Sequence, residues 1–288
     1  MSYTLELAFE PAIPRPRILQ HFTARSHFTV TNDRVAYENR DTGVYFLITL
    51  EATRSLLRQS RIVSAEIDVS YNKPHYFGIE AEIEISALIG EFRPRIHDPQ
   101  MRGMGDGPYS REGFLRGWNF GNQFAIHVAL SKKPDLNIAT MPAEKLRAGW
   151  AWNYDLTARS AMLRNRRYVP AISLWIIEGR RCLVATWPQG LPISLPKVDY
   201  VLVGRVVEGE TRFGLASWSE ILEIIGRAGF DTSATPLDIE YFATPPAIAQ
   251  WVANIPLIDL DRSQQLHGPH VMDEETMAAA REFPVVSS

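Results

Sequence analysis

The sequence predicts an α+β fold: two mixed blocks with largely antiparallel sheets, packed around a long buried helix that carries a ridge of glycines. Apolar and polar residues alternate near the N-terminus, which is typical of half-buried strands. A second group of strand-like runs, within residues 169–260, contains a hairpin turn at Glu178-Gly179. Between the two groups, small residues recur at a strict spacing of four. They are Gly113, Gly117, Gly121, Ala125 and Ala129.

The first block covers residues 1–97. Its expected elements are a strand at 4–9, a helix at 16–24, and strands at 27–37, 44–50 and 62–71. Asn, Asp and Gly residues between 39 and 43 favour a tight turn. The segment 77–92 has two interpretations. It is a helix, or part of it is a strand, because Glu80, Glu82 and Glu84 alternate there with apolar residues.

A middle segment, residues 98–168, holds a glycine-rich loop and the central helices. The loop at 98–109 contains Gly103, Gly105 and Gly107 but matches neither the Walker pattern nor the dinucleotide fingerprint. It leads into a helix whose free N–H groups can attract an anion. We therefore weigh two readings, a structural turn and a site for phosphate or carboxylate.

The helix expected at 111–131 has clear boundary signals. Ser110 can cap its first turn, and Pro134 closes its far end after two lysines. Each glycine inside a helix costs about 1 kcal/mol relative to alanine. The glycine ridge therefore predicts that a second helix or a strand crosses this helix closely.

A narrow polar stripe interrupts the mostly apolar surface of this helix. On one interpretation the stripe is a solvated face or a hydrogen-bonded seam. On the other it lines a ligand pocket together with the preceding loop, and the histidine titrates near neutral pH. The candidate ligand-binding residues are Asp106, Arg116, Asn119, Gln123 and His127.

The last block, residues 169–260, is expected to contain a sheet and two helices. Its strands are expected at 169–177, 181–187, 198–207 and 237–242, and its helices at 218–228 and 246–254. Five arginines near the hairpin suggest either a solvated rim or a docking surface for an acidic partner. These candidate interaction residues are Arg164, Arg166, Arg167, Arg180 and Arg181.

The tail at 261–288 is polar and is expected to be weakly ordered. His267, His270 and Asp273 lie close together in it, but two histidines in a flexible segment are weak evidence for a metal, so no metal site is predicted.

Composition places the chain among ordinary globular proteins. It has 288 residues, 45% of them hydrophobic and 22% charged, with a net charge of -3. This balance argues against nucleic acid as an obligate partner, since phosphate binding needs a basic surface. The N-terminus does not read as a signal peptide, and charges interrupt every apolar run that could span a membrane. Cys182 is expected to be buried and unreactive, so a cytoplasmic protein is the default expectation.

Residues 37–46, 98–122 and 195–205 resemble segments of uncharacterised proteobacterial proteins, some of which look like immunity or accessory partners of toxin systems. No catalytic motif accompanies this resemblance, so neither catalytic residues nor a cofactor are predicted. The favoured hypothesis is a non-catalytic protein that binds another protein, such as a toxin-neutralising immunity-type partner. The alternative is an enzyme or small-molecule binder with a pocket between the two blocks. The oligomeric state is left open.

Overall fold

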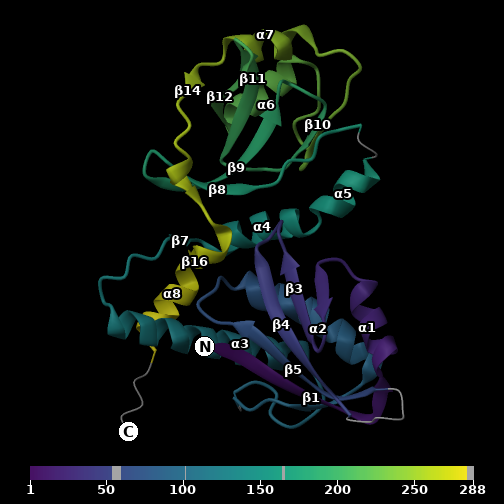
Figure 1. The fold of residues 1–288 in the computed structure, drawn as a ribbon. Coiled ribbons are helices and arrows are strands. Elements are labelled where there is room, and N and C mark those ends of the chain that lie inside the picture. The colour runs from purple at the N-terminus through teal and green to yellow at the C-terminus, as the bar shows by residue number, and fades with distance from the viewer. Residues whose placement is uncertain (54–59, 101, 164–165, 284–288) are drawn as a thin grey trace. The chain divides into compact units, whose positions relative to one another are not determined.

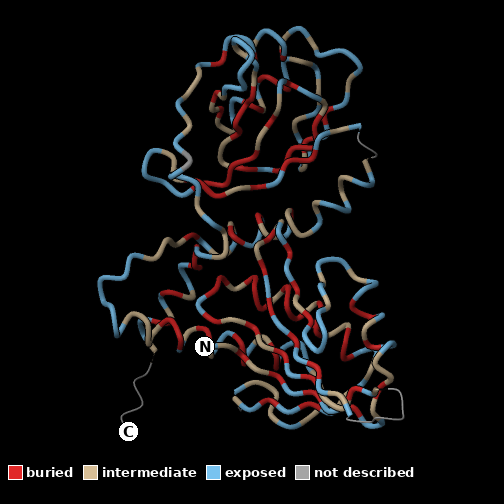
Figure 2. Tube along the Cα trace, viewed as in Figure 1, coloured by how far each residue is buried: buried red, intermediate tan, exposed pale blue. Residues whose placement is uncertain are grey.

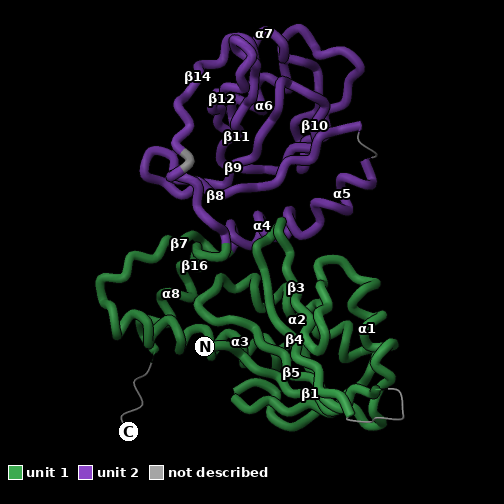
Figure 3. Tube along the Cα trace, in the orientation of Figure 1, with its two compact units in different colours: residues 1–143, 269–288 green, residues 144–268 purple. Residues whose placement is uncertain are grey.

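The computed structural model describes residues 1–53, 60–100, 102–163 and 166–283, and it divides the chain into two compact units (Figure 3). Unit 1 comprises residues 1–143 and 269–288, and unit 2 comprises residues 144–268. Unit 2 is therefore an insertion within unit 1. The two ends of unit 1 at this insertion are held together by a parallel pairing of β7 (Thr140–Met141) with β16 (Met272–Asp273). The four segments expected from the sequence do not coincide with this division.

The sheet of unit 1 is antiparallel, with the strand order β2-β3-β4-β5-β1-β6. The alternation read from the sequence is seen in β1, where Tyr3, Leu5 and Leu7 are buried while Glu6 is exposed. The single strand expected at 27–37 is a hairpin of two strands. The strands are β1 (Ser2–Pro14), β2 (Phe28–Thr31), β3 (Arg34–Asn39), β4 (Val44–Ala52), β5 (Arg61–Ser70) and β6 (Arg95–His97).

Three helices pack on this sheet and a fourth packs on one of them (Figure 1). They are α1 (Arg15–Thr23), α2 (Tyr76–Phe92), α3 (Arg111–Lys132) and α8 (Glu274–Arg281), which contacts α3. The alternating segment 77–92 is thus a helix and not a strand. Its buried glutamate Glu80 accepts hydrogen bonds from Tyr37, Asn39 and Thr42 on neighbouring β3 and the following turn.

The glycines of α3 are where its neighbours approach most closely. Ser110 accepts a hydrogen bond from the Gly113 N–H at 3.0 Å, as a cap residue should. A Cβ added at Gly117 would lie 2.9 Å from Cε2 of Tyr3 in β1, and one at Gly121 would lie within van der Waals overlap of Tyr71 at the end of β5. The close crossing expected from the ridge is therefore made by two tyrosines of the sheet.

The expectation that this helix is buried on nearly all sides, between two blocks, needs correction. It belongs to unit 1, and Phe120 and Phe124 on its other side are 37% and 43% exposed. Both rings contact Phe283, which covers them only in part.

Unit 2 contains a mixed sheet with the strand order β14-β12-β11-β9-β8-β15, in which only β9 and β11 run parallel. The expected hairpin joins β8 to β9, and both turn residues, Glu178 and Gly179, have the positive φ angles that a two-residue turn requires. A short antiparallel pair, β10 with β13, lies beside the sheet. The strands are β8 (Ser173–Ile177), β9 (Arg180–Pro188), β10 (Ile193–Leu195), β11 (Tyr200–Val207), β12 (Glu210–Ser217), β13 (Leu237–Ile239), β14 (Leu257–Ile258) and β15 (Gln265–Leu266).

Helices α6 and α7 begin and end close to the predicted bounds of 218–228 and 246–254. Ser217 and Glu220 form a capping box at the start of α6, as the sequence pattern of such boxes requires. Cys182 is buried in β9, and burial raises the pKa of its thiol. The helices are α4 (Ala143–Tyr154), α5 (Leu156–Met162), α6 (Trp218–Arg227) and α7 (Pro246–Asn254).

Residues 262–283 are more ordered than their polar composition suggests, and Figure 2 shows buried positions along this part of the chain. They supply β15, β16 and α8, and Met272, Met277 and Ala280 form a buried cluster with Ile126 of α3. These few apolar residues belong to the same buried cluster as Ile126. Composition alone does not predict such a cluster, because it depends on a residue far away in the sequence. No helix in the described part of the chain combines the length and apolar character needed to cross a membrane.

Candidate functional site

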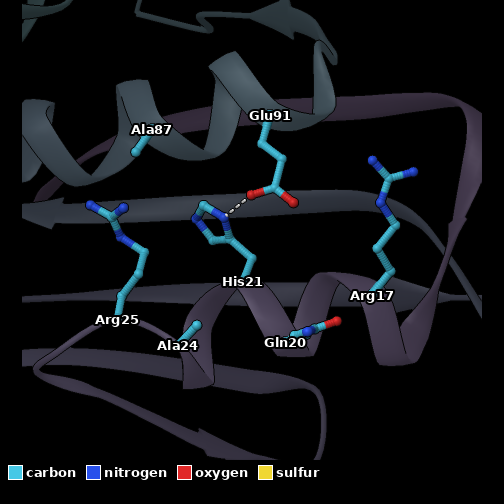
Figure 4. Close-up of a pocket in the computed structure, with 7 residues that line it drawn as sticks. All are labelled: Arg17, Gln20, His21, Ala24, Arg25, Ala87 and Glu91. Atoms are coloured by element: carbon cyan, nitrogen blue, oxygen red, sulfur yellow. Dashed lines mark hydrogen bonds and ion pairs between the residues drawn. The ribbon is translucent and has the colours of Figure 1, made fainter.

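A groove of about 560 Å³ runs between α1 and the C-terminal turns of α2 (Figure 4). Helical spacing builds both walls, since Arg17 and His21 are four residues apart on α1, and Ala87 and Glu91 are four residues apart on α2. Arg25 is the second residue after the end of α1. We call this the α1–α2 groove, and its lining residues are Arg17, Gln20, His21, Ala24, Arg25, Ala87 and Glu91.

His21 lies at the centre of the groove with only 4% of its side chain exposed. Its Nδ1 lies 2.5 Å from Oε2 of Glu91, whose side chain is 43% exposed. An ionised carboxylate only accepts hydrogen bonds, so Nδ1 is the nitrogen that carries a proton. The rings of Phe22 and Phe92 contact the imidazole edge to face, at centroid distances of 5.2 and 5.5 Å. Together these contacts fix the orientation of the ring.

The other imidazole nitrogen, Nε2, is buried and has no hydrogen-bond partner among the described residues. In Figure 4 it faces the Arg25 side of the groove. A buried polar atom without a partner costs about 1–3 kcal/mol. Buried polar groups nearly always have partners, so such an exception calls for an explanation.

The two arginines of the groove differ in how they are paired. Arg25 donates from Nε and Nη2 to Oε2 of Glu84, at 2.9 and 2.7 Å. Arg17 lies over the ring of Phe92, 5.5 Å from its centroid, and forms no ion pair in the part of the chain that the structure describes. The groove therefore presents one unpaired guanidinium, which is suited to an oxyanion, while the buried Nε2 of His21 faces the other side of the groove.

The candidate ligand residues expected from the sequence do not form a common pocket. Asp106 pairs with the exposed His97, and Arg116 donates from Nη2 to the carbonyl of Gly103 at 2.8 Å. Asn119 is exposed and Gln123 is half-buried. The pKa of His97 is raised, chiefly by its hydrogen bond to Asp106.

The glycine-rich loop is a structural turn organised by one buried carboxylate. Asp98 accepts hydrogen bonds from the Tyr3 hydroxyl at 2.7 Å and from the N–H groups of Gln100 and Met104, both at 3.1 Å. Burial and the nearby carboxylate together raise the pKa of Tyr3. A Cβ at Gly103 would overlap Oδ2 of Asp98. Of the two readings weighed for this loop, the structural turn is the one observed, and the carboxylate that its N–H groups bind belongs to the protein itself.

His127 fits the interpretation of a seam. Its Nδ1 lies 3.0 Å from the carbonyl oxygen of Ala280 in α8, and its ring packs near Phe283. A carbonyl only accepts, so His127 donates there.

Two arginines of the candidate cluster are paired with carboxylates of unit 2. Arg167 contacts Glu240 at 2.6 Å and Asp238 at 3.1 Å, and Arg166 lies 3.6 Å from Glu240. Arg180 and Arg181 are exposed where β9 begins. Arg164 lies outside the described residues. Of the four described arginines, two are therefore paired with carboxylates and two are exposed, and the choice between a solvated rim and a docking surface stays a prediction.

Sequence reasoning missed Arg17, His21 and Glu91. A signal was present on one wall, because Arg17 and His21 are four residues apart in the predicted helix at 16–24 and Arg25 continues this spacing just after it. The other wall could not be found in this way, since Glu91 is 70 residues away from His21.

The histidines of the C-terminal segment do not gather a metal site. Asp273 is buried and accepts hydrogen bonds from both the backbone N–H and Nδ1 of His75. Within the described ranges, no group of three or more His, Cys, Asp or Glu side chains is placed to hold a metal ion. Comparison with protein-family models, with curated proteins and with solved structures finds no match.

Proposed function

We propose that this protein is a non-catalytic binding protein whose α1–α2 groove holds an acidic side chain of a partner protein. One observation carries the proposal: Arg17 is exposed at the edge of the groove and forms no ion pair among the described residues. A carboxylate placed beside it would accept from its guanidinium, and hydrogen bonds between charged groups are about twice as strong as neutral ones.

The groove supports binding better than catalysis. The seven side chains that line it include neither a hydroxyl nor a thiol that could act as a nucleophile. His21 is held by Glu91 in the way that a catalytic base would be held, but its free nitrogen is buried. A base must come within hydrogen-bond reach of the proton that it takes. We therefore assign recognition to the exposed Arg17 at the edge of the groove.

A protein partner is favoured over a small molecule by the character of the walls. Pockets for small molecules are lined mainly by apolar and aromatic side chains. In the α1–α2 groove only Ala24 and Ala87 are apolar, while Arg17 and Gln20 are exposed at its edge. An exposed polar groove can receive one acidic residue of a larger interface, whose remaining contacts lie outside it. In its more specific form, the proposal is that this protein is an immunity-type protein and that the partner it binds is a toxin.

Affinity capture with matched variants tests this function. The bait is the full chain as wild type, as Arg17→Gln and as Arg40→Gln, which removes an equal charge from a side chain that is 88% exposed elsewhere on unit 1. We expect a partner that wild type and Arg40→Gln retain and that Arg17→Gln releases, with the purified pair then measured by calorimetry. Partners retained equally by all three baits, or no retained partner, would overturn the proposal.

A further inference from the structure

We infer that the mixed sheet of unit 2 carries a binding site of its own, a pocket that takes a small, uncharged molecule with a planar ring and one hydroxyl or amide group. The pocket is lined by residues of unit 2 alone, whereas the α1–α2 groove belongs to unit 1. The inference therefore goes beyond the proposed function and does not depend on Arg17.

The pocket lies on the face of the sheet that α7 leaves open. Thr186 of β9 lies beside Leu202 of β11, and both line the pocket. The next residue, Trp187, points to the opposite face, because successive side chains of a strand alternate. There it contacts Trp251 of α7, at a centroid distance of 6.2 Å. Helix α7 therefore covers the other face of the sheet, and the face that carries Thr186 is available for a different contact.

The chain between β14 and β15 crosses this open face. The two strands are opposite edges of the sheet, so the segment that joins them passes from one edge to the other. Leu260 in this segment packs against the buried cluster that contains Trp175 and Leu202. A helix or strand of a partner protein would have to displace the segment. The pocket beside it measures about 550 Å³, within the range of roughly 300–1,000 Å³ that is typical of small-molecule sites.

Strand pairing places two aromatic side chains on either side of Thr186. Phe213 lies opposite Ile258 where β12 pairs with β14, and Trp175 lies opposite Gln265 where β8 pairs with β15. Directly opposite residues share one face of a sheet. Phe213 and Ile258 are half-buried, so their side chains keep surface that a ligand can reach. An apolar and aromatic lining of this kind suits a planar ring.

The polar groups of the pocket select an uncharged ligand. The Thr186 hydroxyl is half-buried, has no hydrogen-bond partner among the described residues, and can both donate and accept. The charged lining residues Glu210, Arg212 and Asp259 are all exposed, and Arg212 lies 3.8 Å from Asp259. An ionised ligand would exchange water for an apolar floor, which costs free energy. A hydroxyl or amide beside Thr186 would instead gain a hydrogen bond.

The test uses probes that share one ring system: 2-naphthol, naphthalene and 2-naphthoate. At about pH 7 the first is uncharged, since phenols titrate near 10, and the last is an anion. A pocket without a polar partner would prefer naphthalene, which is the most hydrophobic of these probes. We expect the full chain to bind 2-naphthol about fivefold more tightly than naphthalene, as one hydrogen bond allows, and 2-naphthoate most weakly. NMR should place the 2-naphthol shifts at Phe213, Ile258 and Leu260.

A variant without the hydroxyl tests the selecting group. Thr186→Val nearly keeps the shape of the side chain, so it should lower the affinity for 2-naphthol about fivefold and leave naphthalene binding unchanged. Thr157→Val, at an exposed position on α5, is the matched control and should bind both probes as wild type does. Unchanged naphthalene binding also shows that Thr186→Val is folded.

Three outcomes would overturn the inference. They are wild-type protein that binds 2-naphthol no better than naphthalene, NMR shifts that lie outside the pocket, and a folded Thr186→Val variant that keeps its affinity for 2-naphthol. If Thr186→Val does not fold, the comparison of probes on wild type still decides. None of these results bears on the capture experiment with Arg17→Gln, which judges the proposed function separately.

Discussion

The 98–109 loop and the α1–α2 groove both gather polar side chains on unit 1, yet they differ in how those groups are paired. In the loop, the buried Asp98 accepts three hydrogen bonds, and Arg116 donates to a loop carbonyl. In the groove, His21 and Arg17 each keep a polar group without such a partner in the described chain.

This difference distinguishes polar groups that stabilise the fold from polar groups that are available to bind a ligand. A polar group satisfied within the fold stabilises it, and its removal costs stability. A charged group left without a partner at the surface, as Arg17 is, stays available to a ligand. Loop substitutions should therefore change stability, and groove substitutions should change binding.

The largest expected effect on stability comes from a substitution in the glycine ridge of α3, which lies beside the loop. Gly117→Leu should lower the free energy of unfolding by about 3 kcal/mol or more, because added bulk meets Tyr3 and the backbone of Gly103. Gly90→Leu is the matched control, since nothing lies within 4 Å of its added Cβ. Urea denaturation of both variants checks this. Equal stability of the two would show that the ridge is not tightly packed.

Asp98→Asn should lower the free energy of unfolding by about 2 kcal/mol, because the amide would present N–H donors where Tyr3 and the loop backbone also donate. Binding of sulfate, an oxyanion that probes Arg17 in the groove, should be unchanged. Denaturation and calorimetry on one preparation provide the check. A stable variant, or one that loses sulfate binding, would contradict the assignment of this loop to structure.

His127→Ala should lower the free energy of unfolding by about 1 kcal/mol, since it removes a hydrogen-bond donor to the Ala280 carbonyl and a ring contact with Phe283. Asn119→Ala, an exposed position on the same helix, should have almost no effect on stability. Thermal denaturation of the pair measures the difference. A His127→Ala variant with native stability and lost ligand binding would restore the pocket interpretation of the polar stripe.

The smallest effect concerns the exposed pair of His97 and Asp106. Because this hydrogen bond raises the pKa of His97 above its value of 6.5, the pair stabilises the folded state at low pH. That contribution is lost as pH rises through the raised pKa. NMR titration should show that Asp106→Asn lowers the pKa of His97, while the titration of His27 stays the same. An unchanged His97 would mean that the contact does not persist in solution.

Local signals made much of the fold predictable. Ser110 and the glycine ridge predicted α3, and the Glu178-Gly179 turn predicted the β8–β9 hairpin, because both depend on residues close in sequence. Strand β12 and helix α8 were missed. The apolar residues of α8 are few, and they are buried only because Ile126, far away in the sequence, lies beside them.

The candidate site was less predictable for the same reason. The stripe on α3 draws attention because polar residues stand out on an apolar helix, but Asn119 is exposed, and Arg116 and His127 are hydrogen-bonded within unit 1. The groove requires two helices whose approach is set by the sheet on which both pack. Sequence spacing gives one wall of it, at Arg17 and His21, and the position of Glu91 follows only from the tertiary structure.

The central claim is that the unpaired Arg17 of the groove serves binding while the paired groups of the loop serve stability. It is tested most directly by measuring denaturant stability and sulfate affinity together on Arg17→Gln and Asp98→Asn. We predict a crossed result: Arg17→Gln stays within about 0.5 kcal/mol of wild type in stability but loses sulfate binding. Asp98→Asn loses stability and keeps binding. Two variants that lose the same property, or an Arg17→Gln protein that binds sulfate as wild type does, would contradict the claim.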